Sequence, residues 1–142
     1  MAEQSPTQLI NDWLAAAKSA NPSHAKTVAQ KIAGYYTDNA VLCATPEGIV
    51  NGRTAIEQDY EQNFEAGFVV TGISNQSINT VTGQPWAWAY GLWNGSSPFP
   101  PPSGPVTQLS GCWSILLVNQ GTSGQANWLI QQHTIATNQV TS

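Results

Sequence analysis

The distribution of charge along the chain constrains the fold more than any other feature of the sequence. All eight acidic and all four basic residues lie at or before Glu65, and none follows. Beyond that point the solvent-facing positions must be filled by neutral polar residues such as Ser, Thr, Asn and Gln. A sheet surface without ions loses little when it is covered by another protein. We therefore expect a homodimer or a higher homo-oligomer that forms through a sheet in the second half.

Length and composition limit the class of protein. The 142 residues match one domain, and 41% hydrophobic residues with six tryptophans are enough for a core. Four basic residues and a net charge of −4 argue against binding of nucleic acid. The sequence also lacks an apolar run of about 20 residues, so we expect no membrane partner. No secretory signal is evident at the N-terminus, which predicts a cytoplasmic protein.

Apolar residues in the first half recur every three or four positions, which indicates amphipathic helices. The expected helices run from Thr7 to Ala20 after an N-cap at Ser5, from about Ser23 to Tyr36, and from Arg53 to Ala66. Between the last two, the alternating segments Ala40–Cys43 and Ile49–Val50 predict a short hairpin. Three helices and a hairpin thus precede the uncharged half.

The uncharged half has the composition of long strands. The expected strands are Phe68–Val81, Trp86–Trp93, Val106–Val118 and Asn127–Thr137. Four strands in succession predict an antiparallel meander, and the proline-rich segment Gly95–Pro105 is expected to be an ordered loop at its rim. Residues 1–5 and 138–142 are candidates for disorder. The whole chain is thus predicted to be one α+β domain spanning residues 1–142.

Two stretches resemble the NTF2-like superfamily, in particular its SnoaL-like and ketosteroid-isomerase-like branch. The first reads Tyr36-Thr37-Asp38-Asn39-Ala40-Val41-Leu42 and, after a turn, Gly52-Arg53-Thr54-Ala55-Ile56; the second is Trp128-Leu129-Ile130-Gln131-Gln132-His133. The resemblance implies a cone-shaped, cystatin-like fold in which three N-terminal helices pack on a strongly curved, mostly antiparallel sheet. It also implies a deep apolar cavity that is open at one end.

Members of this superfamily include isomerases, dehydratases, epoxide hydrolases, polyketide cyclases and non-catalytic association modules, so the fold leaves the chemistry open. The carboxylates that a ketosteroid isomerase uses have no counterpart in Leu42–Thr45 or Leu109–Trp113. His133 is the remaining candidate for a catalytic acid or base. The alternative is that His133 is a hydrogen-bonded residue of the cavity wall.

Aromatic residues are the candidates for ligand contacts. Tyr60 shares the inward face of the third helix with Ile56 and Phe64, whereas the acidic residues of that helix are expected to be solvated. Strand alternation places Trp88 and Tyr90 together and Trp93 on the other side. The predicted ligand-binding residues are Tyr60, Phe64, Trp88, Tyr90, Trp113 and His133, although such rings are also typical of a core.

The remaining polar residues are expected to be structural. Arg53 opens the third helix and should pair with Asp38 or Glu57, or else anchor a ligand carboxylate. We predict no metal and no cofactor, because the sequence has no cluster with metal-ligand spacing and no glycine-rich phosphate loop. Cys43 and Cys112 are expected to be reduced thiols, with a disulfide between them as the alternative.

The sequence leaves two functions open. The first is a small-molecule-binding protein with an apolar pocket, acting on a small apolar or aromatic molecule as a cofactor-independent isomerase, cyclase or hydrolase. The second is a non-catalytic homo-oligomerisation module that uses the uncharged sheet face.

Overall fold

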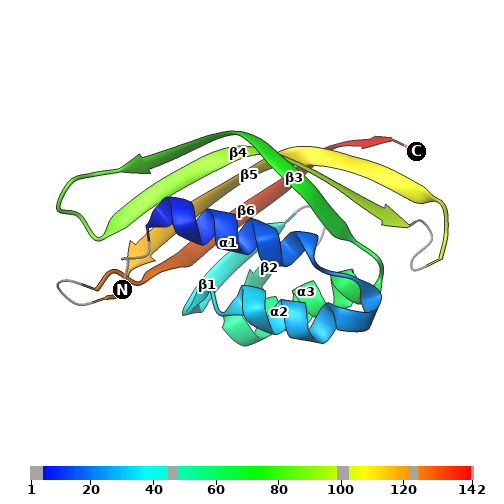
Figure 1. Cartoon of the computed structure of the whole chain (residues 1–142), viewed down its shortest axis with the longest axis horizontal. Coiled ribbons are helices and arrows are strands. Elements are labelled where there is room, and N and C mark those ends of the chain that lie inside the picture. Colours follow the sequence, from blue (N-terminus) through cyan, green and yellow to red (C-terminus); the bar gives the residue numbers. More distant parts are fainter. Residues whose placement is uncertain (1–4, 45–47, 99–102, 122–124, 142) are drawn as a thin grey trace.

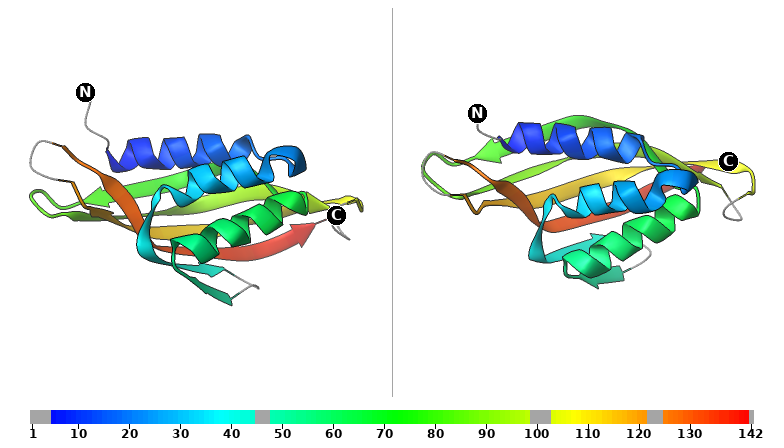
Figure 2. Two further views of the ribbon diagram at one scale, coloured as in Figure 1. Left: turned by 90° about the horizontal axis from the view of Figure 1, so that it is seen from below. Right: turned by 60° about the horizontal axis from the view of Figure 1, so that its bottom comes forward.

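The computed structural model describes residues 5–44, 48–98, 103–121 and 125–141. Within these ranges, three α-helices lie side by side over one face of a curved sheet, and the opposite face carries no helix (Figures 1 and 2). The helices are α1 (Pro6–Lys18), α2 (Ala25–Ala33) and α3 (Arg53–Glu65), with a 3₁₀ turn, η1 (Pro22–His24), before α2. In the described part of the chain, no helix is long and apolar enough to cross a membrane.

The helix boundaries follow from local hydrogen bonds. The Ser5 side chain accepts a hydrogen bond from the Gln8 backbone at 3.1 Å and so caps α1, as predicted. The second helix is shorter than predicted at both ends. The Asn21 side chain caps η1 first, so α2 begins only at Ala25. At the other end, Tyr36 belongs to a strand, since the preceding carbonyl of Tyr35 accepts a hydrogen bond from Ile130.

The sheet has six strands in the order β2-β1-β6-β5-β4-β3. They are β1 (Tyr36–Ala44), β2 (Gly48–Asn51), β3 (Val69–Thr80), β4 (Trp86–Pro98), β5 (Val106–Asn119) and β6 (Trp128–Thr141). The β1–β2 hairpin and the antiparallel meander from β3 to β6 are confirmed. A parallel pairing of β1 with β6, which joins Leu42 to His133, connects the hairpin to the meander.

Several strands extend beyond their predicted limits, and β4 and β6 do so at their C-terminal ends by four residues or more. In β4 the strand continues through Pro98, because Ser97 and Pro98 pair with Thr107 and Val106 across the expected proline-rich loop. Residues 99–102 of that loop lie outside the described residues, as do residues 1–4 and 142. In β6 the backbone pairs with β5 as far as Thr141, beyond the predicted end at Thr137.

The hydrophobic core lies between the helices and the covered face of the sheet. Along β4, Ala87, Ala89, Gly91 and Trp93 are buried while the residues between them are exposed. The small side chains of Ala87 and Ala89 leave room for the helices above them. The strand alternation thus divides β4 into an inner face that meets the helices and an outer face that meets solvent.

Candidate functional site

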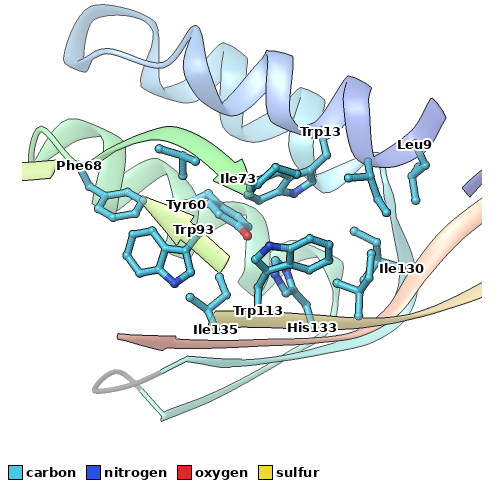
Figure 3. Close-up of a pocket in the computed structure, with 13 residues that line it drawn as sticks. Leu9, Trp13, Tyr60, Phe68, Ile73, Trp93, Trp113, Ile130, His133 and Ile135 are labelled. Atoms are coloured by element: carbon cyan, nitrogen blue, oxygen red, sulfur yellow. The ribbon is translucent and has the colours of Figure 1, made fainter. Parts of the chain in front are cut away.

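An apolar cavity lies between α1, α3 and the inner face of the sheet (Figure 3). Its volume is about 60 Å³. Apolar side chains form nearly all of the lining, and among the described residues that line it none is charged. The lining includes Leu9, Trp13, Tyr60, Phe68, Ile73, Trp93, Trp113, Ile130, His133 and Ile135. Nonpolar groups in a ligand would therefore be well matched to most of this surface.

Two of the three tryptophans in the wall are held by backbone hydrogen bonds. The indole N–H groups of Trp93 and Trp113 donate to the carbonyl oxygens of Ala136 and Leu92, each at 3.1 Å. Glycines provide the space for these rings: a Cβ atom at Gly111 would lie 2.7 Å from the Trp93 nitrogen, and one at Gly91 would lie 3.0 Å from the Trp113 nitrogen. These two rings are fixed parts of the cavity wall.

Three buried polar side chains that are linked by hydrogen bonds border the cavity. His133 Nδ1 lies 2.7 Å from the Tyr36 hydroxyl, which lies 2.9 Å from the Tyr60 hydroxyl. Tyr36 comes from the first residue of β1, Tyr60 from α3 and His133 from β6. His133 can reach Tyr36 because the parallel pairing places β6 next to β1. These hydrogen bonds therefore depend on the parallel pairing of β1 with β6, which joins the two halves of the molecule.

Burial keeps His133 and Tyr36 uncharged. It lowers the pKa of His133 from 6.5 to about 3, because a buried imidazolium loses its hydration. Burial also raises the pKa of Tyr36 above its usual value of 10, and the hydrogen bond from Tyr60 opposes this only in part. At neutral pH both side chains are neutral, so the cavity contains a polar group without a net charge.

The direction of the hydrogen bond between Tyr36 and His133 decides what the other ring nitrogen can do. If the Tyr36 hydroxyl donates to Nδ1, the proton of the imidazole is on Nε2, which can then donate to a ligand. If Nδ1–H donates, Nε2 is an acceptor. The hydrogen bond that His133 forms with a described residue uses Nδ1 and leaves Nε2 without a partner among these residues. Nε2 is therefore available to a bound molecule.

Trp13 is the least constrained wall of the cavity. It is only partly buried, and its ring packs edge-on against Tyr60 and His133, with centroid distances of 6.3 and 5.7 Å. Its indole nitrogen is buried and has no hydrogen-bond partner among the described residues. The indole lies close enough to the Tyr36 hydroxyl to lower the pKa of Tyr36, but not in good hydrogen-bond geometry, so the position of the ring depends mainly on packing.

The structure brings together three of the six predicted ligand-binding residues, namely Tyr60, Trp113 and His133. Phe64 is fully buried but packs behind Tyr60, at a centroid distance of 5.7 Å, and does not line the cavity. The placement of Trp88 and Tyr90 needs correction. They are 40% and 50% exposed on the outer face of β4, because Ala87 and Ala89 occupy the inner positions against the helices.

Sequence reasoning missed Trp13, Trp93 and Tyr36 as members of the site. Trp13 lies among the apolar residues that recur every three or four positions in the first helix, and this spacing was the available signal. In β4 the signal was the alternation itself, which places Trp93 on the same side as the small residues Ala87, Ala89 and Gly91. Tyr36 could not be found from a local pattern, since its partner His133 is 97 positions away.

Other predicted polar residues have structural positions. Arg53 forms the predicted ion pair with Asp38 at 2.7 Å and also donates two hydrogen bonds to the Tyr36 carbonyl oxygen, at 3.0 and 2.6 Å. It does not line the cavity. Cys43 and Cys112 are unpaired. Within the described residues, no group of three His, Cys, Asp or Glu side chains is placed to hold a metal ion.

Comparisons with known proteins find relatives in structure only. No family model and no curated protein matches the sequence. A candidate calcium/calmodulin-dependent protein kinase II association domain from Xanthomonas campestris matches with a TM-score of 0.69 and 17% identity, over 97% of this chain and 93% of that one. A candidate scytalone dehydratase from Novosphingobium aromaticivorans matches with a TM-score of 0.68 and 16% identity, over 95% and 83%.

A third match is a protein of unknown function from Nostoc punctiforme, described as having a cystatin-like fold. Its TM-score is 0.66 at 12% identity, over 96% of each chain. Identities this low show the fold alone. The fold is shared by a candidate enzyme and a candidate association domain. The comparisons, the three helices and the curved, mostly antiparallel sheet together show that this chain has the NTF2-like, cystatin-like fold.

Proposed function

We propose that the protein binds a small, neutral, apolar or aromatic molecule in this cavity, with His133 as the hydrogen-bond partner of its polar group. One observation carries the proposal: a buried, neutral histidine has one ring nitrogen held by Tyr36 and the other without a partner among the described residues, in an otherwise apolar lining. Such a site favours nonpolar surface and selects for one polar atom at a defined position.

The size of the cavity limits what can enter without rearrangement. About 60 Å³ is several times the volume that one water molecule needs, but less than the roughly 150 Å³ of a cavity that admits benzene. A ring-sized ligand therefore requires one wall to move. Trp13 is the candidate, because it is partly exposed on α1 and its indole nitrogen has no partner among the described residues.

The chemistry we propose for the site is polarisation or weak-base catalysis, as in a cofactor-independent isomerase, cyclase or hydrolase. With its pKa near 3, His133 is not an imidazolium at neutral pH and cannot act as a strong general acid. As a neutral donor, Nε2–H would polarise a ligand carbonyl; as a neutral acceptor, Nε2 would accept a proton from an activated C–H or O–H group. The proposal does not require a carboxylate.

Tryptophan fluorescence provides the test, since three tryptophans line the cavity. We would titrate the protein with matched pairs that differ in one carbonyl group, such as cyclohexanone with methylcyclohexane and naphthaldehyde with methylnaphthalene. Because one hydrogen bond contributes about 1 kcal/mol, each carbonyl compound should bind roughly fivefold more tightly than its hydrocarbon. In His133→Phe this preference should vanish while the hydrocarbon affinities stay similar.

The matched control is Trp88→Phe, which removes an indole from the outer face of the same sheet and should leave all the affinities unchanged. If His133→Phe does not fold, the imidazole ¹⁵N shifts of the wild-type protein replace it: a carbonyl ligand should move Nε2 and leave Nδ1 nearly constant. The proposal is wrong if no compound of the panel binds at millimolar concentration, or if the carbonyl preference survives in His133→Phe.

The alternative function, a non-catalytic association module, would use the outer face of the sheet. It does not compete with the cavity for residues, because the cavity lies on the inner face.

A further inference from the structure

Tyr36 is held so that its hydroxyl group meets His133. Its side chain is fully buried, and its carbonyl oxygen accepts two hydrogen bonds from Arg53. Along an unbroken parallel register Tyr36 would lie beside Asn127, but an irregularity in the pairing of β1 with β6 places it beside Ile130 instead. This shift brings Tyr36 nearer to His133 along β6, and the hydroxyl oxygen and Nδ1 lie 2.7 Å apart.

The Tyr36 hydroxyl has one proton to donate, and the polar groups of Trp13, Tyr60 and His133 lie next to it. The indole N–H of Trp13 can only donate, so the Tyr36 oxygen is an acceptor on that side. The proton of Tyr36 is therefore donated either to the Tyr60 hydroxyl or to His133. The group that receives this proton determines the direction of both hydrogen bonds.

We infer that Tyr36 donates this proton to Nδ1 of His133 and so fixes the imidazole in its Nε2–H form, which makes the cavity a site for hydrogen-bond acceptors. The 2.7 Å separation is in the usual range for an O–H donor, whereas an N–H donor usually lies about 2.9–3.0 Å from an oxygen acceptor. The imidazole is neutral at this site. A phenol hydroxyl is a better donor than a neutral imidazole N–H, and an imidazole nitrogen is a better acceptor than a phenol oxygen.

This assignment rests on the proposed function for its ligand and narrows the class of ligand. With a proton on Nε2, that nitrogen has no free lone pair and cannot accept a hydrogen bond or a proton from a bound molecule. A ketone, aldehyde, ester or nitrile has an acceptor that satisfies the buried N–H group. A molecule whose polar group is only a donor would leave this N–H unpaired, which is costly in a buried site. Tyr36 is thus a positioning residue that acts through His133.

The ¹⁵N NMR shifts of His133 in the ligand-free protein test the assignment. We expect Nε2 to have the shift of a protonated nitrogen and Nδ1 that of an unprotonated nitrogen that accepts a hydrogen bond. In Tyr36→Phe, Nδ1 should move to the value of a nitrogen without a hydrogen bond. The matched control is Tyr60→Phe, which removes the other hydroxyl that is bonded to Tyr36 and should leave Nδ1 as a hydrogen-bonded acceptor.

A protonated Nδ1 in the wild-type protein would overturn the inference, as would an Nδ1 shift that Tyr36→Phe leaves unchanged. If Tyr36→Phe does not fold, replacing all tyrosines with 3-fluorotyrosine keeps each hydroxyl and makes it more acidic. A hydrogen bond donated by Tyr36 should then become stronger and move Nδ1 further toward the shift of a protonated nitrogen. A weaker bond in the fluorinated protein would show that Nδ1–H is the donor and would overturn the inference.

Ligand binding, followed by the His133 shifts, is a further measurement. Cyclopentanone, which is only an acceptor, should bind roughly fivefold more tightly than cyclopentane. Pyrrole, which is a donor, should bind no more tightly than thiophene. A preference for pyrrole over thiophene without one for cyclopentanone would contradict the inference and leave the proposed binding function intact. If none of the four compounds binds, the proposed function fails, and the ligand-free ¹⁵N shifts still decide which nitrogen is protonated.

Discussion

Acidification should destabilise this protein through one side chain, His133. In the folded state burial lowers the pKa of His133 to about 3, whereas in the unfolded chain it should be close to the ordinary value of 6.5. Between these two values the unfolded chain binds a proton that the folded protein does not. The contribution to stability is therefore fully present above pH 6.5 and decreases as the pH falls through that value toward 3.

The magnitude follows from the width of the interval. Each pH unit below 6.5 shifts the equilibrium toward the unfolded state by about 1.4 kcal/mol until the folded protein also binds the proton. Between pH 7.5 and 5.0 the loss should be about 2 kcal/mol. For a domain of this size that corresponds to a decrease in Tm of roughly 4–8 °C. We end the interval at pH 5.0, because below this value protonation of carboxylates would contribute to the measured loss of stability.

Urea unfolding at several pH values, followed by tryptophan fluorescence, measures this loss. The control is His24→Gln, which removes the exposed histidine of η1 and should keep the full pH dependence. In His133→Gln the dependence should be absent, whatever the stability of that variant. If the variant does not fold, the NMR chemical shift of the imidazole Cε1–H proton of His133 in the wild-type protein replaces it. This shift should stay constant from pH 8 to 5. Titration of that resonance near pH 6.5 would refute the reasoning.

Two further predictions concern the framework around the site. Arg53→Met should decrease the free energy of unfolding by about 2 kcal/mol, because it removes two charged hydrogen bonds to the Tyr36 carbonyl oxygen. Asp38→Asn should decrease it by less than about 1 kcal/mol, since the Asp38 carboxylate is 90% exposed. Equal losses in urea unfolding would contradict this assignment. Gly111→Ala should decrease the free energy of unfolding by more than about 3 kcal/mol or prevent folding, because the added Cβ atom would clash with the carbonyl oxygen of Ala136 on β6. The control is Gly72→Ala, whose Cβ atom would have no atom within 4 Å; its stability should stay within about 1 kcal/mol of wild type in the same assay.

Much of the fold could be predicted because the two halves have different local patterns. The helical stripe that contains Ile56, Tyr60 and Phe64 and the alternation in β4 depend only on neighbours a few positions apart. The limits of the elements were less predictable. Tyr36 was expected to end a helix and instead begins β1, since its environment is set by Arg53 and Ile130, which the chain brings there from other elements.

The residues of the candidate site could be predicted only where their place in the sequence was enough to assign them to the cavity. His133 and Trp113 could be assigned to the cavity through the family resemblance and through strand position. Trp88 and Tyr90 were assigned to it because large aromatic rings were expected to prefer the interior, although alternation leaves open which face of a strand is covered. The tertiary structure decides this question, because it buries the face of β4 that carries Ala87 and Ala89 and leaves Trp88 and Tyr90 exposed.

The segregation of charge has a consequence for the cavity as well as for the outer face. His133 is supplied by the half of the chain without Asp, Glu, Lys or Arg, and none of the described lining residues from the other half is charged. A nearby carboxylate would raise the pKa of His133 and stabilise an imidazolium, which the present surroundings do not. The same shortage of charge therefore also keeps the inner cavity neutral. A ligand carrying a full charge would have to be desolvated there without a counterion, so benzoate should bind far more weakly than benzaldehyde.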